Sequence, residues 1–175
     1  MLNIAFLFGT LSGLVVVAGA IAWIIFGNDL GTGGEIVGYL IMIMALSMIF
    51  FGVKRYRDQE LGGVIKFLPA FMTGLAIALV AAVIYVLVWE VYDAATGRTF
   101  IGTYTASLIE AARAKGTTGP ALDAMIKEME TLKVQYADPL FRVPMTFLEI
   151  FPVGLVIALI SAALLRNPKL LPARA

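Results

Sequence analysis

Long uncharged apolar runs dominate this chain, and short polar segments separate them. Four runs approach the roughly 20 residues that a helix needs to cross a bilayer core of about 30 Å, and they cover residues 3–26, 36–53, 67–89 and 143–165. Turn-forming glycines, basic residues or proline mark their ends. Because a backbone amide in lipid must find its partner within the chain, each run predicts a transmembrane helix.

The segment between the third and fourth runs has a different pattern. Its second half carries five apolar residues at the spacing of one helical face, with charged residues on the other faces: Leu122, Met125, Ile126, Met129 and Leu132. A shorter amphipathic stretch covers about 103–115, and Gly116 and Gly119 separate the two. The expected fold is therefore an all-α membrane protein with four transmembrane helices and an amphipathic helical hairpin between the third and fourth.

We expect three parts in this chain. Residues 1–92 hold transmembrane helices one to three, 93–142 form the hairpin, and 143–175 hold the fourth helix and a tail. A cleaved signal peptide is the alternative for the first run, since Ala18-Gly19-Ala20 is similar to a small-residue cleavage site. That alternative is disfavoured because no basic residue precedes the apolar run and the run is too long.

Positive charge determines the expected orientation, because short loops rich in Lys and Arg stay in the cytoplasm. Six such residues follow the second and fourth runs: Lys54, Arg55, Arg57, Arg166, Lys169 and Arg174. The loop after the first run has Asp29 and no basic residue. Both termini should then be cytoplasmic and the hairpin extracytoplasmic.

Small residues recur at helical spacing within the runs. In lipid, helices gain no hydrophobic free energy by burying apolar surface against one another. Close contacts between them therefore depend on small side chains. The residues expected at these contacts are Gly9, Gly13, Gly74, Ala78, Gly154 and Ala158. They are explained either by packing within one four-helix bundle or, for Gly9 and Gly13, by a homo-oligomer, and the sequence does not separate the two.

The composition of the chain limits which partners and which kinds of site are expected. The chain is 61% hydrophobic and 14% charged, with a net charge of +1, whereas soluble domains average about 25% charged residues. Membrane lipid is thus an expected partner and nucleic acid is not. The chain has no Cys and no His, which excludes disulfides, thiol nucleophiles and imidazole ligands. No phosphate-binding loop occurs, so we expect no enzyme, no cofactor and no metal site.

Carboxylates near the membrane are the candidates for a functional site. Glu35 begins the second run, Glu90 ends the third, and Glu149 lies inside the fourth, shortly before Pro152. An ionisable group in lipid is costly and is therefore a site hypothesis by default, so Glu149, Glu90 and Glu35 could form a cation or proton site. In the alternative, Glu35 and Glu90 face interfacial water, and Glu149 is neutral or hydrogen-bonded to Tyr85, Tyr92 or Arg142.

Several linear motifs resemble a known family. They are 35-EIVGYL, 44-MALS followed by 50-FFGVKRYRD, 62-GGVIKF, 85-YVLVWE, 146-TFLEIFPVG and 159-LISA. Together they resemble the bacterial membrane family catalogued as domain of unknown function 4199. The resemblance covers nearly the whole chain, and it implies a four-span protein of the bacterial inner membrane without implying an activity.

The function expected from these observations is that of an interaction or accessory membrane protein. The apolar stripe 122–132 must be covered by the bundle, by the lipid interface or by a protein partner. One alternative is a small proton- or cation-coupled carrier that uses an intramembrane carboxylate. A second alternative is lipid handling at the outer interface.

Overall fold

The computed structural model describes residues 1–26 and 32–173, and every regular element within them is an α-helix. The helices are α1 (Leu2–Phe26), α2 (Thr32–Leu46), α3 (Met48–Glu60), α4 (Phe67–Ala95), α5 (Phe100–Ala114), α6 (Gly119–Ala137) and α7 (Pro139–Leu165). Four stretches are long and apolar enough to cross a membrane: Leu2–Phe26, Ile36–Glu60, Phe67–Ala95 and Pro139–Leu165. The predicted all-α fold with four membrane-crossing helices is confirmed.

The second of these stretches joins α2 and α3 across a short interruption. Ser47 lies between the two helices, and its hydroxyl donates a hydrogen bond to the carbonyl of Met44 at 2.6 Å. A serine that bonds back to the preceding turn competes locally with the helical hydrogen bonds. The stretch also continues to Glu60, beyond the predicted end at residue 53.

Three helices begin earlier than the sequence pattern predicts, and one of them is α2, which starts at Thr32 rather than at residue 36. Helix α7 starts at Pro139 rather than at residue 143, and α5 starts at Phe100 rather than near residue 103. At the start of α7 the Asp138 side chain accepts a hydrogen bond from the amide of Leu140 at 2.9 Å, while proline suits the first helical turn. The apolar pattern misses the first turns of α5 and α7 because Gly102 and Arg142 interrupt it, although both turns contain apolar residues.

Helix α1 packs closely along α4. A Cβ added at Gly9 would lie 2.6 Å from the Cβ of Val80, and one added at Gly13 would lie 2.6 Å from the carbonyl oxygen of Ala81. Both distances are shorter than atoms tolerate, so only glycine allows this approach. The face formed by these two glycines is therefore occupied by α4 of the same chain.

Helices α4 and α7 pack through reciprocal small residues. A Cβ added at Gly74 would lie 2.9 Å from the Cβ of Ala158, and one added at Gly154 would lie 2.9 Å from the Cβ of Ala78. Position 74 thus pairs with 158 and position 78 with 154, so the two helices run antiparallel at this contact. Since α4 also contacts α1 and α3, it lies at the centre of the bundle.

A buried arginine holds the chain together where α3 ends. The Arg57 side chain is 0% exposed, and it donates hydrogen bonds to the carbonyl of Leu170, at 3.0 Å, and to that of Leu171. Its Nε also lies 2.7 Å from a carboxylate oxygen of Asp58. These bonds fasten the segment after α7 to α3.

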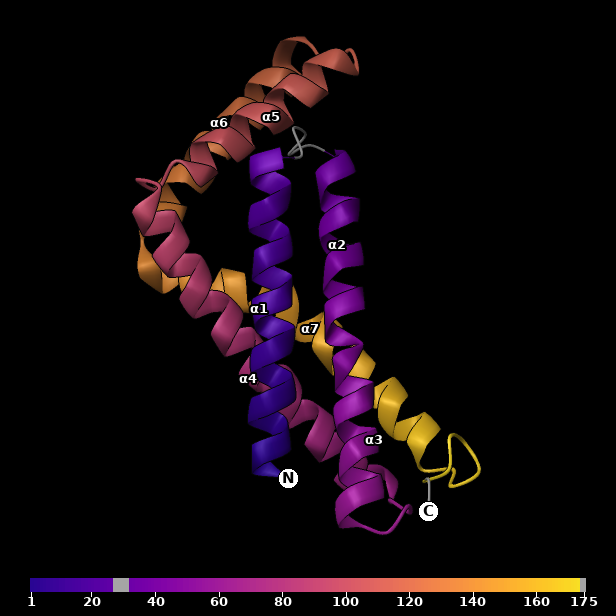
Figure 1. Cartoon of the computed structure of the whole chain (residues 1–175). Coiled ribbons are helices and arrows are strands. Elements are labelled where there is room, and N and C mark those ends of the chain that lie inside the picture. Colours follow the sequence, from indigo (N-terminus) through magenta and orange to yellow (C-terminus); the bar gives the residue numbers. More distant parts are fainter. Residues whose placement is uncertain (27–31, 174–175) are drawn as a thin grey trace.

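The two ends of the bundle differ in what they carry. Figure 1 shows the start of α1 and the ends of α3 and α7 together at one end, which we call the terminal end. Helices α5 and α6 contact each other and lie toward the opposite end, which we call the α5–α6 end. Which end faces the cytoplasm stays a prediction from the charge pattern.

Candidate functional site

A cavity of about 530 Å³ lies toward the α5–α6 end of the bundle. Six helices contribute to its wall, namely α1, α2, α4, α5, α6 and α7. The lining residues are Trp23, Gly34, Gly38, Tyr39, Met42, Tyr85, Trp89, Phe100, Ile101, Tyr104, Leu132, Tyr136, Met145, Thr146, Leu148 and Glu149. The cavity therefore exists only in the assembled fold, because these residues come from almost the full length of the chain.

Aromatic side chains form much of the wall. Both of the chain's tryptophans, Trp23 and Trp89, line the cavity. The Trp89 ring lies edge-on to Phe100 with 4.8 Å between centroids, and its Nε1 donates to the hydroxyl oxygen of Tyr136 at 3.1 Å. Burial raises the pKa of the Tyr136 hydroxyl above its ordinary value. This hydroxyl therefore stays neutral over the physiological range of pH.

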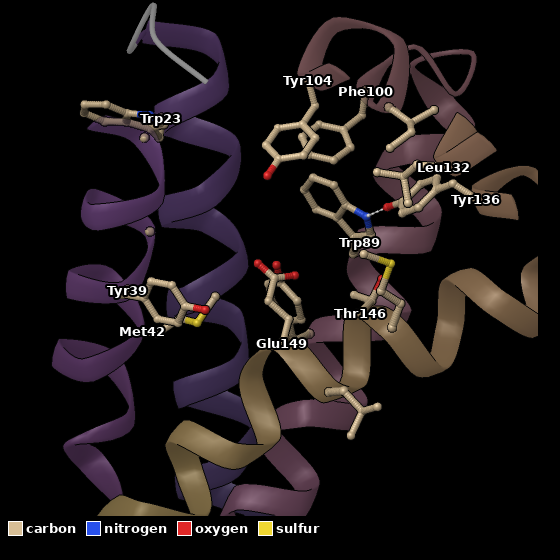
Figure 2. Close-up of a pocket in the computed structure, with 16 residues that line it drawn as sticks. Trp23, Tyr39, Met42, Trp89, Phe100, Tyr104, Leu132, Tyr136, Thr146 and Glu149 are labelled. Carbon is tan, nitrogen blue, oxygen red and sulfur yellow. Dashed lines mark hydrogen bonds between the residues drawn. The ribbon is translucent and has the colours of Figure 1, made fainter. Parts of the chain in front are cut away.

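Glu149 carries the one charge among the sixteen lining residues that the structure describes. Figure 2 shows its carboxylate directed into the space bordered by Trp23, Tyr39 and Trp89. Protein atoms surround Glu149 on most sides, yet its side chain stays accessible because it faces the cavity. The buried Tyr85 lies close enough to Glu149 to interact with it electrostatically.

A proline one turn after Glu149 leaves one helix carbonyl without its usual donor. Proline has no N–H, so Pro152 removes the helical donor that the carbonyl of Leu148 would otherwise receive. Leu148 itself lines the cavity. The segment around Glu149 therefore offers a carboxylate and a helix carbonyl that lacks its usual bond.

Glu90 belongs to a different cluster. Its two carboxylate oxygens accept hydrogen bonds from Arg142, one from Nε at 2.6 Å and one from Nη2 at 2.8 Å. Arg142 is 1% exposed, and its Nη1 also donates to the carbonyl of Tyr136 at 2.8 Å. Because this bidentate pair satisfies both charges, Glu90 is not a free ligand, and it is not among the residues that line the cavity.

The same cluster contains a second ion pair that the sequence did not suggest. Arg98 lies 3.2 Å from a carboxylate oxygen of Asp93 and 3.9 Å from one of Glu90. Asp93 is 1% exposed, and its Oδ1 has no hydrogen-bond partner among the described residues. The sequence contained a clue to this pair, since Asp93 and Arg98 both lie shortly after the third apolar run. Their pairing depends on the tight turn between α4 and α5.

The third predicted carboxylate, Glu35, lies on α2, and its side chain is outside the part of the chain that the structure describes. The structure thus brings Glu149 to the cavity and pairs Glu90 with Arg142. Within the described residues, no three carboxylate, thiol or imidazole side chains lie close enough to hold a metal ion together.

The apolar stripe of α6 is half-buried along most of its length. Met129 is buried, at 9% exposed, while Leu122, Met125, Ile126 and Leu132 are intermediate. Helix α6 contacts α5 and α7, and Leu132 also lines the cavity. The stripe is thus partly covered within the chain, and binding of a protein partner there stays a prediction.

Comparisons with known proteins place most of the chain in one family. Residues 7–167 match the family model described as Protein of unknown function (DUF4199). Searches of curated proteins and of solved structures give no significant match. Any functional conclusion must therefore come from the geometry of the cavity.

Proposed function

The chain belongs to the DUF4199 family, and because the description of that family names no activity, we propose a function from the cavity itself. The protein is a small carrier that binds a cation or a proton at Glu149. It lies in a bacterial inner membrane as a multi-pass protein with both termini in the cytoplasm. Its role is transport and not catalysis.

One observation carries the proposal: an accessible carboxylate without a cationic partner lines a cavity between membrane-crossing helices. No Lys or Arg of residues 1–26 or 32–173 forms an ion pair with Glu149, whereas Glu90 has Arg142 beside it. A carboxylate at such a place is costly to keep. Binding a cation or a proton is the chemistry that offsets this cost.

The asymmetry of the bundle supports transport over simple binding. The cavity lies toward the α5–α6 end, while Gly74, Ala78, Gly154 and Ala158 bring α4 and α7 into close contact beyond it. A cavity that lies nearer one end, with closely packed helices toward the other, is the asymmetry expected of a carrier in one of its two states. Pro152 lies in α7 just after Glu149 and supplies a point where that helix can bend.

An accessory role and a lipid-handling role have less support. The α6 stripe, which would have to meet a protein partner, is already half-buried where α6 packs on α5 and α7. Lipid acyl chains need an apolar groove, and they give no reason for a carboxylate in its wall. Both roles stay predictions.

Ion flux into proteoliposomes tests the proposal directly. With a pH gradient or a potassium diffusion potential imposed, the wild-type protein should allow proton or cation entry above that of protein-free liposomes. Glu149→Gln should reduce the flux to the protein-free level, because it removes the charge and keeps the shape of the side chain. Glu128→Gln is the matched control, since Glu128 is an exposed residue of α6. A Glu149→Gln variant that folds and conducts like wild type overturns the proposal, as does a wild-type protein without flux.

The proposed orientation has its own test. The chain has no Cys, so single cysteines report their position without background. Arg55→Cys and Lys169→Cys should react with a membrane-impermeant maleimide only after the cells are opened, because the positive-inside rule puts both in the cytoplasm. Lys127→Cys on α6 should react in intact spheroplasts. Labelling of residues 55 and 127 from the same side contradicts this orientation.

A further inference from the structure

We propose that the ligand of this cavity is an organic cation, with one ammonium-type charge attached to an apolar body of drug-like size. The inference rests on the proposed function in that both use Glu149, and it adds the chemical class of the ligand. It distinguishes such a ligand from a bare proton and from an inorganic ion.

The charge of the wall sets the charge of the ligand. Among the sixteen described lining residues Glu149 is the only one with a carboxyl group, and none is basic. One carboxylate in a wall of low polarity is neutralised by one positive charge. A divalent metal ion would need about six oxygen ligands, and the side chains of the wall offer one carboxylate and a few hydroxyls. The donor set therefore does not suit a metal ion.

The aromatic rings determine which type of cation fits. Seven of the sixteen lining residues are aromatic, and two of these are tryptophans. The face of an aromatic ring attracts a cation, most strongly for Trp, and this interaction is the usual means by which proteins bind quaternary ammonium groups. A quaternary ammonium ion is weakly hydrated, so it loses little when rings replace its water. A small inorganic ion holds its water more strongly and gains less from the same wall.

The volume of the cavity and the apolar part of its wall indicate the size and character of the ligand beyond its ammonium group. A volume of about 530 Å³ falls in the usual range of roughly 300–1,000 Å³ for small-molecule sites, far larger than one ion requires. Met42, Leu132 and Met145 supply flexible apolar surface in the same wall. Thioether side chains adapt to irregular apolar groups, so an alkyl or aryl body can fill the space beside the ammonium group.

The exposed part of the wall indicates how the ligand enters. Tyr39 on α2 is 52% exposed and Leu148 on α7 is 62% exposed, whereas Trp89 on α4 is 4% exposed. The accessible rim of the cavity therefore carries an amphipathic ring and an aliphatic side chain. A molecule with an apolar body can approach such a rim from the lipid or from its interface, as amphiphiles do.

Tryptophan fluorescence tests the inference, because both tryptophans of the chain line the cavity. The full-length protein, in lipid nanodiscs with a tryptophan-free scaffold, is titrated with benzyltrimethylammonium. Its uncharged isostere neopentylbenzene is titrated in parallel. The cation should change the emission in a saturable way, with an affinity at least about tenfold higher than that of the isostere.

Variants identify the groups responsible. Glu149→Gln should weaken binding of the cation at least about tenfold, as expected when the partner of a desolvated charge is removed, and Glu128→Gln should leave it unchanged. At Tyr39, replacement by Leu should weaken binding about threefold or more, while replacement by Phe keeps the ring and should preserve affinity. Tyr39 is half exposed, so neither change should prevent folding.

The outcomes separate this inference from the carrier proposal. Equal binding of cation and isostere overturns the inference and favours an apolar or lipid ligand. No binding of the cation, together with a proton flux that needs Glu149, overturns the inference and leaves the carrier proposal standing. Saturable cation binding that needs Glu149, without any flux, supports the inference and overturns the carrier.

Discussion

Glu149 and Glu90 lie toward the same end of the bundle, and their surroundings differ. Glu90 is held by two hydrogen bonds from Arg142, which has almost no exposed surface. Glu149 has the hydroxyl of Tyr85 beside it and otherwise faces the cavity. An arginine thus holds one carboxylate within the fold, and the carboxylate that no arginine reaches is the one for which we propose binding.

The largest effect should come from removing the arginine. Arg142→Met leaves Glu90 without its partner and two backbone carbonyls without their donor, which should lower the free energy of unfolding by about 3–5 kcal/mol. Glu149→Gln should change stability by less than about 1 kcal/mol, since no ion pair is broken. Thermal unfolding in detergent measures both variants. Equal losses of stability in the two variants would contradict the proposed difference between Glu90 and Glu149.

A double variant sharpens this comparison. Adding Glu90→Gln to Arg142→Met removes the charge that was left unpaired, so part of the lost stability should return. If the two changes are simply additive, the bonds between Arg142 and Glu90 contribute little to the fold.

Glycine substitutions compare the part of the bundle where helices pack closely with the part that borders the cavity. We expect a loss of stability smaller than that of Arg142→Met. Gly13→Ala places a Cβ 2.6 Å from the carbonyl oxygen of Ala81, so the backbone must shift, and we expect a loss of about 1–3 kcal/mol. A Cβ at Gly38, which lines the cavity, meets nothing within 4 Å. Gly38→Ala should therefore be neutral or slightly stabilising. Thermal melts of the two variants test whether a glycine is needed where α1 packs on α4 and not where α2 borders the cavity.

The smallest effect concerns Tyr136, which connects the two regions. Its carbonyl accepts from Arg142, while its hydroxyl accepts from Trp89 in the wall of the cavity. Tyr136→Phe keeps the first bond and removes the second, so we expect a loss of about 1 kcal/mol and a shift of tryptophan emission. An unchanged emission spectrum would show that Trp89 does not depend on this hydroxyl.

The pH dependence of stability follows from the same residue. The pKa of Tyr136 is raised from its ordinary value of 10.0 because the hydroxyl is buried. The unfolded chain then releases this proton first, so the stability contributed by the neutral hydroxyl is complete below about pH 10 and decreases as the pH rises above it. Tyr136→Phe should flatten this alkaline decrease in a series of thermal melts.

The sequence alone determined the helical class and the four stretches long and apolar enough to cross a membrane, and it singled out Glu149 as a candidate for a site. These features depend on local quantities, namely the length of an apolar run and the cost of a charge within it. The predicted starts of α5 and α7 were less accurate, because Gly102 and Arg142 interrupt the apolar pattern within the first turns.

Only the tertiary structure decided which charges meet. Arg142 and Glu90 are 52 residues apart in the chain, and the sequence offered Arg142 as an alternative partner of Glu149. It also left open whether Gly9 and Gly13 face another chain, whereas in the fold α4 covers them. The cavity combines residues from six helices, and helical periodicity shows which face of a helix is apolar without showing what lies opposite. Contacts between distant segments depend on how the helices cross, and that is a property of the whole bundle.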